Sequence, residues 1–234
     1  MVLIGTIVNA LAIFMGSLIG MVFSRISDSM KDLLMKGIGL TVIVLGVQMG
    51  MQSQQFLIVI LSIAIGAAIG EITKLEERFN DLGQKLEEKI GRKSTIAEGF
   101  ITASLIFCVG AMAVVGAIDS GLRGDHSILF TKALLDGFTA MILTATLGYG
   151  VLFSIVPVFL YQGSIAIFAS FLTGVLSSEW IELFIHEITA AGGIMILAIG
   201  LNLAGITKIK VANLLPGLLV VLLLIPIFVH FQLV

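Results

Sequence analysis

The sequence predicts an all-α protein embedded in a membrane: a polytopic bundle of about eight transmembrane helices that forms a single transmembrane domain over residues 1–234. Hydrophobic residues make up 58% of the 234 residues and charged residues only 12%, about half the charged share of a soluble domain. A surface in water needs more polar groups than this composition supplies, whereas a surface in lipid does not. The lipid bilayer is therefore the first expected partner.

Eight apolar segments are long enough to be spans. A helix rises about 1.5 Å per residue, so roughly 20 residues cross a hydrocarbon layer of about 30 Å. The segments lie near residues 2–23, 36–51, 55–71, 97–118, 128–147, 151–176, 187–205 and 211–231. The boundary between the fifth and sixth spans is the least distinct, and a different division there gives seven or nine spans.

Residues 72–93 form a segment of another kind. Leu75, Phe79, Leu82 and Leu86 recur along one face of a helix, and charges of both signs occupy the other faces. This pattern predicts a cytoplasmic amphipathic helix. It is either a solvated connection lying on the membrane surface or a contact with another subunit or partner.

Lysine and arginine gather in three loops, which predicts the orientation of the chain. Eleven of the 13 basic residues lie between spans one and two, three and four, or seven and eight. Cytoplasmic loops collect such residues, and an even number of spans places all three loops on one side. Together with the short loops, this favours a multi-pass protein of the bacterial cytoplasmic (inner) membrane with both termini outside.

The two ends of the chain resemble each other weakly. Residues 10–50 align with 164–204 without a gap, and eight positions are identical, three of them glycines. The alignment pairs repeat one (1–71) with repeat two (151–234) around a central helix pair (97–147), and a displacement of five spans inverts the second copy. The acidic segment SSEWIELFIHE (177–187) is then an outer loop. Inverted repeats are typical of secondary transporters, although a duplication kept for folding, or a channel, also fits.

Three glycine pairs spaced four residues apart begin at Gly16, Gly46 and Gly66. Small residues at this spacing let helix backbones approach closely. The pattern predicts packing within one chain or, alternatively, a homo-oligomer.

Asp136 is the leading candidate for a functional residue, because ionisable groups inside a membrane are costly. Lys132 lies one helical turn before it on the same face. The two form either a structural ion pair or a substrate or ion site at which Asp136 changes protonation.

Further polar residues complete the set of candidates for binding a small solute or ion. In the segment DSGLRGDHS, Asp119, Asp125 and His126 either gather a cation at the predicted outer mouth or are simply hydrated. Asn9 and Gln162 occupy similar places in spans one and six. Gln48 and Asn202 correspond through the repeat, so these amides either join helices or line a central site.

Other classes of function lack their sequence signals. The net charge of −2 gives no basic surface for nucleic acid. A P-loop and the motifs HExxH, GxSxG and CxxC are absent, the three histidines are far apart, and Cys108 is the single cysteine. We therefore expect no enzyme, no catalytic residue, no metal and no cofactor.

The segment at residues 107–163, FCVGAMAVVGAIDSGLRGDHSILFTKALLDGFTAMILTATLGYGVLFSIVPVFLYQG, resembles a bacterial membrane-protein family catalogued as domain-of-unknown-function family 554. The N-terminal GTIVNALAIFMGSLIG is also similar. The resemblance implies a multi-span cytoplasmic-membrane protein without specifying a substrate. It places Asp119, Asp125, Lys132, Asp136 and Gln162 in the family's most characteristic stretch.

Secondary transport of a small solute or ion is the function that these patterns favour. The alternatives are a non-transporting membrane sensor or assembly partner that acts through the 72–93 helix, or a channel. Deletion of that helix distinguishes the first alternative, and saturable counterflow distinguishes the second.

Overall fold

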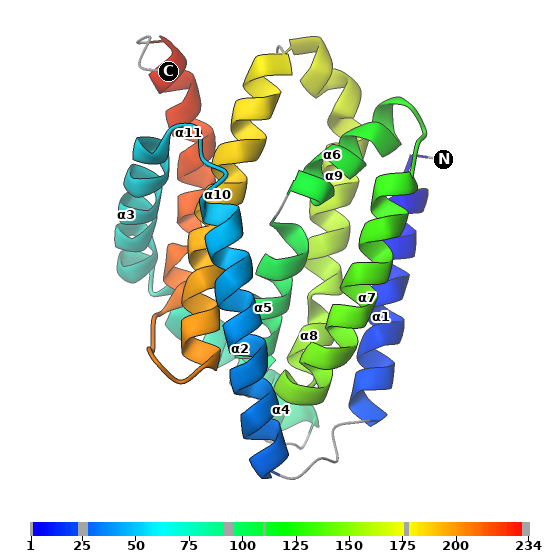
Figure 1. Cartoon of the computed structure of the whole chain (residues 1–234), viewed down its shortest axis with the longest axis vertical. Helices are drawn as coiled ribbons and strands as arrows, with labels where there is room; N and C mark the ends of the chain where they lie inside the picture. Colours follow the sequence, from blue (N-terminus) through cyan, green and yellow to red (C-terminus); the bar gives the residue numbers. More distant parts are fainter. Residues whose placement is uncertain (1, 23–27, 91–95, 110, 176–177, 231–234) are drawn as a thin grey trace. The chain divides into compact units, whose positions relative to one another are not determined.

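The computed structural model of the chain describes residues 2–22, 28–90, 96–109, 111–175 and 178–230. These ranges contain helices and no strand, in agreement with the predicted all-α class (Figure 1). The elements are α1 (Ile4–Val22), α2 (Asp28–Gly50), α3 (Phe56–Thr73), α4 (Leu75–Ile90), α5 (Ile96–Cys108), α6 (Ala111–Leu122), α7 (Ser127–Leu147), α8 (Gly150–Phe153), α9 (Ile155–Val175), α10 (Ser178–Leu203), the 3-10 turn η1 (Val211–Leu214) and α11 (Pro216–His230). In this described part, seven helices are long and apolar enough to cross a membrane.

The bent pair α5–α6 occupies the span predicted near residues 97–118, and counting the pair as one span gives eight spans. The two helices meet at an angle of 57° and do not form one straight helix. Gly99 of α5 lies against Leu147 at the end of α7, whereas Gly116 of α6 lies against Leu129 near its beginning. The pair therefore runs antiparallel to α7, from near its end to near its beginning.

Helix α10 begins earlier than the predicted span 187–205. The acidic segment 177–187, expected as an outer loop, is helical from Ser178 onward. Its apolar residues continue the helical pattern of the span, and Glu179 in the first turn favours a helix N-terminus because of the helix dipole. The difference moves Glu187 from a loop into a buried position on a membrane helix.

The amphipathic helix predicted at residues 72–93 corresponds to α4. Lys74 separates it from α3 by adopting a left-handed conformation, with φ of 53°. Gly148, with φ of 79°, likewise ends α7 at the boundary that the sequence left least distinct.

The chain folds into two compact units. Unit 1 consists of Met1–Asp32 and Leu82–Ser177, and unit 2 of Leu33–Asp81 and Ser178–Val234. In unit 1, α1 and α7 run parallel in close contact. A Cβ atom added at Gly16 would lie 2.0 Å from the carbonyl oxygen of Gly137, and one added at Gly20 would lie 2.3 Å from that of Met141. Only glycine permits backbones to approach this closely.

Unit 2 uses the same device between antiparallel helices. A Cβ atom at Gly46 of α2 would lie 2.4 Å from the backbone nitrogen of Leu197 in α10, and one at Gly66 of α3 would lie 2.3 Å from that of Gly217 in α11. The glycine pairs noted in the sequence thus pack helices within one chain.

A polar clasp joins the end of α3, the beginning of α4 and η1. The amide of Asn213 donates to Glu71 at 2.7 Å, and its oxygen accepts from the backbone N–H of Glu76 at 2.8 Å. Lys210 Nζ lies 2.9 Å from a Glu71 oxygen.

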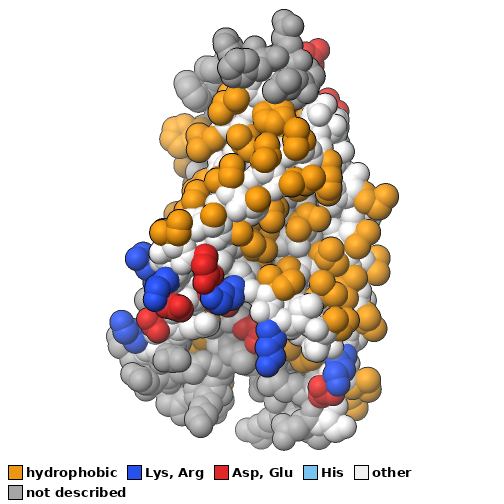
Figure 2. Space-filling model, turned by 90° about the vertical axis from the view of Figure 1, so that its left-hand side faces the viewer, with side chains coloured by type: hydrophobic (Ala, Val, Ile, Leu, Met, Phe, Trp, Pro, Cys, Tyr) orange, Lys and Arg blue, Asp and Glu red, His pale blue; other side chains and the backbone are white. Residues whose placement is uncertain are grey.

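Figure 2, which views the molecule from the side of α3, shows hydrophobic side chains over much of this face and charged side chains gathered toward one end. Such a distribution suits a lipid-facing surface with one polar boundary.

Two glycines of α2 provide a matched test of the close contacts. Gly46→Ala forces a methyl group against the backbone of α10, so we expect a loss of about 1–3 kcal/mol of stability. A Cβ atom added at Gly37, in contrast, would meet no atom of the described residues within 4 Å. Gly37→Ala should therefore be neutral or stabilising by up to about 1 kcal/mol, because alanine favours helix. Thermal unfolding in detergent micelles, followed by circular dichroism, measures both, and equal effects would contradict the packing described above.

Candidate functional site

A buried ion pair lies in the middle of unit 1. Lys132 and Asp136 occupy consecutive turns of α7, and the Lys132 ammonium lies 2.9 Å from one carboxylate oxygen of Asp136 and 2.8 Å from the other. The two residues are only 7% and 6% exposed. Asp136 stands nine residues into α7, about 14 Å along its axis, so the pair belongs to the interior of a span.

Two amides from other helices surround this pair. Asn9 of α1 donates from Nδ2 to Asp136 Oδ2 at 3.0 Å, and the same nitrogen donates to Gln162 Oε1 of α9 at 3.3 Å. Asn9 and Gln162 are both fully buried. Four of the eight residues predicted as candidates thus form one network, here called the Asp136 cluster, that connects α1, α7 and α9.

The Asp136 cluster is incompletely satisfied. Among the described residues, Asn9 Oδ1 and Gln162 Nε2 have no hydrogen-bond partner, although both side chains are fully buried. Leaving such an atom unpaired costs about 1–3 kcal/mol. A network kept only to join three helices would gain by pairing these atoms, so their state is typical of a site that receives another molecule.

Unpaired hydroxyls extend the polar interior of unit 1. The buried hydroxyls of Thr6 and Ser17 on α1, Thr144 on α7 and Ser104 on α5 lack partners in the described part of the chain. Thr6 and Ser17 are separated by 11 residues, or about 17 Å along α1. Sequence analysis did not single out Thr6, Ser17 or Ser104, because an isolated hydroxyl in an apolar helix normally bonds to its own backbone.

The candidate residues Asp119, near the end of α6, and Asp125, between α6 and α7, have separate partners. Asp119 forms an ion pair of 3.7 Å with Arg123, whose side chain is 76% exposed. Asp125 accepts hydrogen bonds from the hydroxyl and the backbone N–H of Ser127, which hold the pKa of this carboxyl below its usual value. Its position suits the beginning of α7, where backbone N–H groups need acceptors. Asp119 and Asp125 are thus engaged in different local interactions.

Gln48 and Asn202, which correspond to each other in the predicted repeat, both lie in unit 2 but have different surroundings. Gln48 is exposed on α2. Asn202 holds the turn after α10, since its amide donates to the carbonyl of Ile209 at 2.8 Å and its oxygen accepts from Thr207 at 2.8 Å. Asn202 therefore has a structural role in the loop.

Glu187 is a buried carboxylate that the sequence analysis missed. It is fully buried on α10 and accepts hydrogen bonds from the Ser53 hydroxyl at 2.6 Å and from the backbone N–H groups of Gln54 and Gln55 at 2.8 and 2.9 Å. The carboxylate therefore fixes the turn between α2 and α3. The apolar residues that precede Glu187 in the segment 177–187 were the available signal that a helix contains it.

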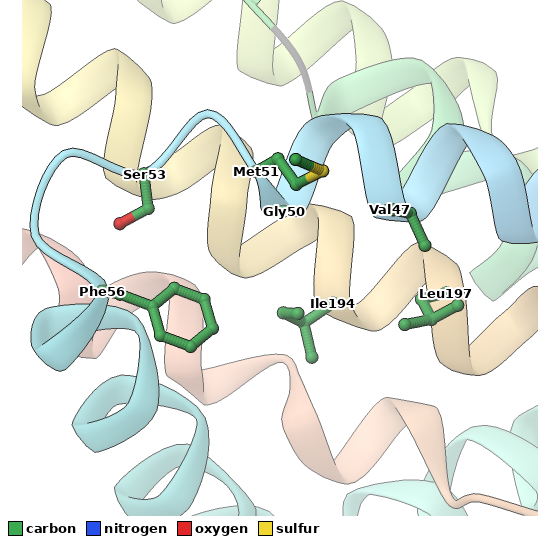
Figure 3. Close-up of a pocket in the computed structure, with 7 residues that line it drawn as sticks. All are labelled: Val47, Gly50, Met51, Ser53, Phe56, Ile194 and Leu197. Atoms are coloured by element: carbon green, nitrogen blue, oxygen red, sulfur yellow. The ribbon is translucent and has the colours of Figure 1, made fainter.

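A shallow hollow of about 360 Å³ lies beside this turn. In Figure 3 the Phe56 ring, at the start of α3, and Ile194 of α10 border the same space, which Ser53 also lines. Apart from Ser53, the side chains bordering the hollow are apolar, so it offers little to recognise a polar solute.

Among the described residues, no group of three or more His, Cys, Asp or Glu side chains is arranged to hold a metal ion.

Removing one charge of the buried Lys132–Asp136 pair should cost more stability than removing both charges. Asp136→Asn leaves the Lys132 ammonium unpaired in a nonpolar interior, with an expected loss of about 3–5 kcal/mol, whereas the double variant Lys132→Met, Asp136→Leu should lose considerably less. The Asp119–Arg123 pair, whose arginine side chain is exposed, serves as the control, and Asp119→Asn should cost less than about 1 kcal/mol. Thermal unfolding of the four proteins in micelles gives the comparison. A double variant as unstable as Asp136→Asn would argue against an isolated charge as the cause.

Comparisons with known proteins agree on the family. The chain is 39% identical to the uncharacterized membrane protein YdfK of Bacillus subtilis over 221 residues, which cover 92% of this chain and 93% of that protein. It is 30% identical to the uncharacterized protein YqgA of Escherichia coli, with the same coverage of both chains. No solved structure matches significantly. The family model described as a protein of unknown function, DUF554, matches residues 4–226, and the chain belongs to this family.

Proposed function

We propose that the protein is a secondary transporter that moves a small solute across the bacterial cytoplasmic membrane, with the Asp136 cluster as its binding site. The buried Lys132–Asp136 pair, held by Asn9 and Gln162 from two other helices, is the observation that carries this proposal. Each charge placed at the centre of a span costs about 2.5–3.5 kcal/mol by insertion scales. Apolar residues at these positions would pack three helices at lower cost, so binding is the better explanation for the charges.

The surroundings of the Asp136 cluster support a path through unit 1. Helices α5 and α6 make a broken span beside α7, and breaks in membrane helices are tolerated where they are buried in protein or line a cavity. The unpaired hydroxyls of Thr6 and Ser17 lie on either side of Asn9 along α1. Polar groups at several depths of one unit are what a hydrated solute needs to cross it.

Contacts in unit 2 support the proposed inverted repeat. The alignment pairs Gly39 with Gly193 and Gly46 with Gly200. In the structure, Gly39 packs against Gly200 and Gly46 against Gly193. When Gly39 and Gly200 are each replaced by their aligned counterparts, Gly193 and Gly46, the first contact becomes the second. This is expected for helices related by a twofold axis. Inverted repeats give transporters two similar halves that can open alternately to either side.

Flux into liposomes tests the proposal. Purified protein should take up solute from at least one pool of amino acids, organic acids or inorganic ions, and the uptake should saturate and show counterflow. Asn9→Leu removes the amide that joins Asp136 to Gln162 and should lower the initial rate at least tenfold, because a misplaced binding group strongly reduces productive binding.

Ser164→Ala is the control, since Ser164 is exposed on α9 and donates to the carbonyl of Tyr161. This variant should transport normally. Flux without saturation or counterflow would indicate a channel. Absence of flux from every pool, with folded protein, would favour a membrane sensor or assembly partner.

The proposed orientation, with both termini outside, is tested by cysteine labelling. After replacement of Cys108 by alanine, single cysteines are placed at exposed Gln52, between α2 and α3, and at exposed Lys208, between α10 and η1. An impermeant maleimide should label Gln52→Cys in intact cells and Lys208→Cys only after permeabilisation, because the loops rich in Lys and Arg face the cytoplasm. The reverse pattern would invert the topology.

A further inference from the structure

The two unpaired atoms of the Asp136 cluster have opposite hydrogen-bonding character. Asn9 Oδ1 is an acceptor and Gln162 Nε2 is a donor, and both are buried. Their orientations are set by the network. The Asp136 carboxylate only accepts, so the Asn9 nitrogen must face it, and the Gln162 oxygen must then face that nitrogen. Rotating either amide would place two acceptors or two donors together, so the unpaired atoms follow from the chemistry of the network.

Charge balance limits which molecule this site can take. The Lys132–Asp136 pair is neutral as a whole. A bound cation or anion would leave one uncompensated charge in a nonpolar interior, which is strongly unfavourable. A molecule that carries one positive and one negative group keeps the site neutral, and it gives each protein charge a new partner.

The side of the Asp136 cluster between α1 and α9 is packed less tightly than the contact between α1 and α7. A Cβ atom at Gly163, next to Gln162, would meet Leu3 at 3.6 Å and Thr6 at 4.0 Å, which are ordinary contact distances. At Gly16 the corresponding distance to a backbone oxygen is 2.0 Å. Thr6, whose methyl group faces Gly163 on this side, lies one helical turn from Asn9, and its buried hydroxyl is unpaired among the described residues.

We propose that the Asp136 cluster binds a small zwitterion of the amino-acid type. This inference rests on the proposed transport function and names its class of substrate. The ammonium of the ligand pairs with Asp136 and donates to Asn9 Oδ1, while its carboxylate pairs with Lys132 and accepts from Gln162 Nε2. The ligand thus separates the Lys132–Asp136 pair and satisfies both atoms that are unpaired without it.

Binding by purified full-length protein in micelles tests the inference, with glycine and alanine as zwitterions. Three relatives of glycine each lack one of its charges: acetate lacks the ammonium, whereas methylammonium and glycinamide lack the carboxylate. We expect glycine or alanine to raise the unfolding temperature in a saturable manner and to bind at least tenfold more tightly than the three relatives. Equal or tighter binding of any relative, or no binding of either zwitterion, would overturn the inference.

Gln162→Glu changes the charge of the site without changing the size of the side chain. The new carboxyl group can be ionised when a cationic ligand compensates its charge, so the preference of the site should shift from glycine toward glycinamide and methylammonium by at least tenfold. Simple damage to the fold would weaken all ligands together and leave the ratio unchanged. An unchanged ratio in protein that still binds glycine would refute the assigned role of Gln162, and Ser164→Ala should keep the original preference.

Liposome flux separates this inference from the proposed function. Saturable uptake of an organic acid or inorganic ion, with no glycine or alanine binding, would refute the zwitterion and leave transport supported. Specific zwitterion binding without flux from any pool would support the site and refute transport.

Discussion

The close approach of helix backbones at glycine is the constraint on which this structure depends. Lipid chains are as apolar as leucine, so there is little hydrophobic force to bring membrane helices together, and they associate mainly through van der Waals packing and hydrogen bonds. Each unit meets this requirement with glycine facing a backbone atom, as at Gly16 against Gly137 in unit 1 and Gly46 against Leu197 in unit 2. A methyl group at either position would separate the helices.

Tight contact between helices at these glycines also means that the polar contacts between the same helices need not be strong. Because α1 and α7 are held along their length by Gly16 and Gly20, the Asp136 cluster does not have to hold the helices together. Its hydrogen bonds can then change when a ligand enters, whereas an isolated pair of helices joined only by Asn9 and Asp136 would come apart. In unit 2 the Glu187 carboxylate differs, because the hydrogen bonds that it accepts come from the turn between α2 and α3 and hold that turn in place. This difference supports the proposal that the first carboxylate binds a ligand, whereas the second has a structural role.

Sequence predicted the features that depend on composition over a whole span and missed those that depend on single contacts. The spans at α1, α3 and α7 follow from apolar length, and the charged pair was visible because Lys132 and Asp136 are conspicuous in an apolar run. The bend between α5 and α6 was not visible, because both halves are equally apolar. Glu187 was assigned to a loop for its charge, although the turn between α2 and α3 supplies this buried carboxylate with three hydrogen-bond donors. Hydrogen-bond donors contributed by a distant loop have no signature in the helix that uses them.

The proposed repeat and the two charges of the Asp136 cluster make different contributions to the orientation of a bound ligand. When the alignment of residues 10–50 with 164–204 is extended by one residue, Asn9 falls opposite Gly163, the neighbour of Gln162. The two amides that approach each other across α1 and α9 thus hold nearly equivalent places in the proposed repeats. Lys132 and Asp136 lie on α7, outside both repeats, and add a charge of each sign at different heights on one helix. The order of the two charges along α7 can orient a ligand, and the unpaired acceptor of Asn9 and unpaired donor of Gln162 add to this orientation. If the proposed inverted repeats alternate in exposing the site to either side of the membrane, this asymmetry would let the proposed zwitterion keep one orientation throughout the cycle.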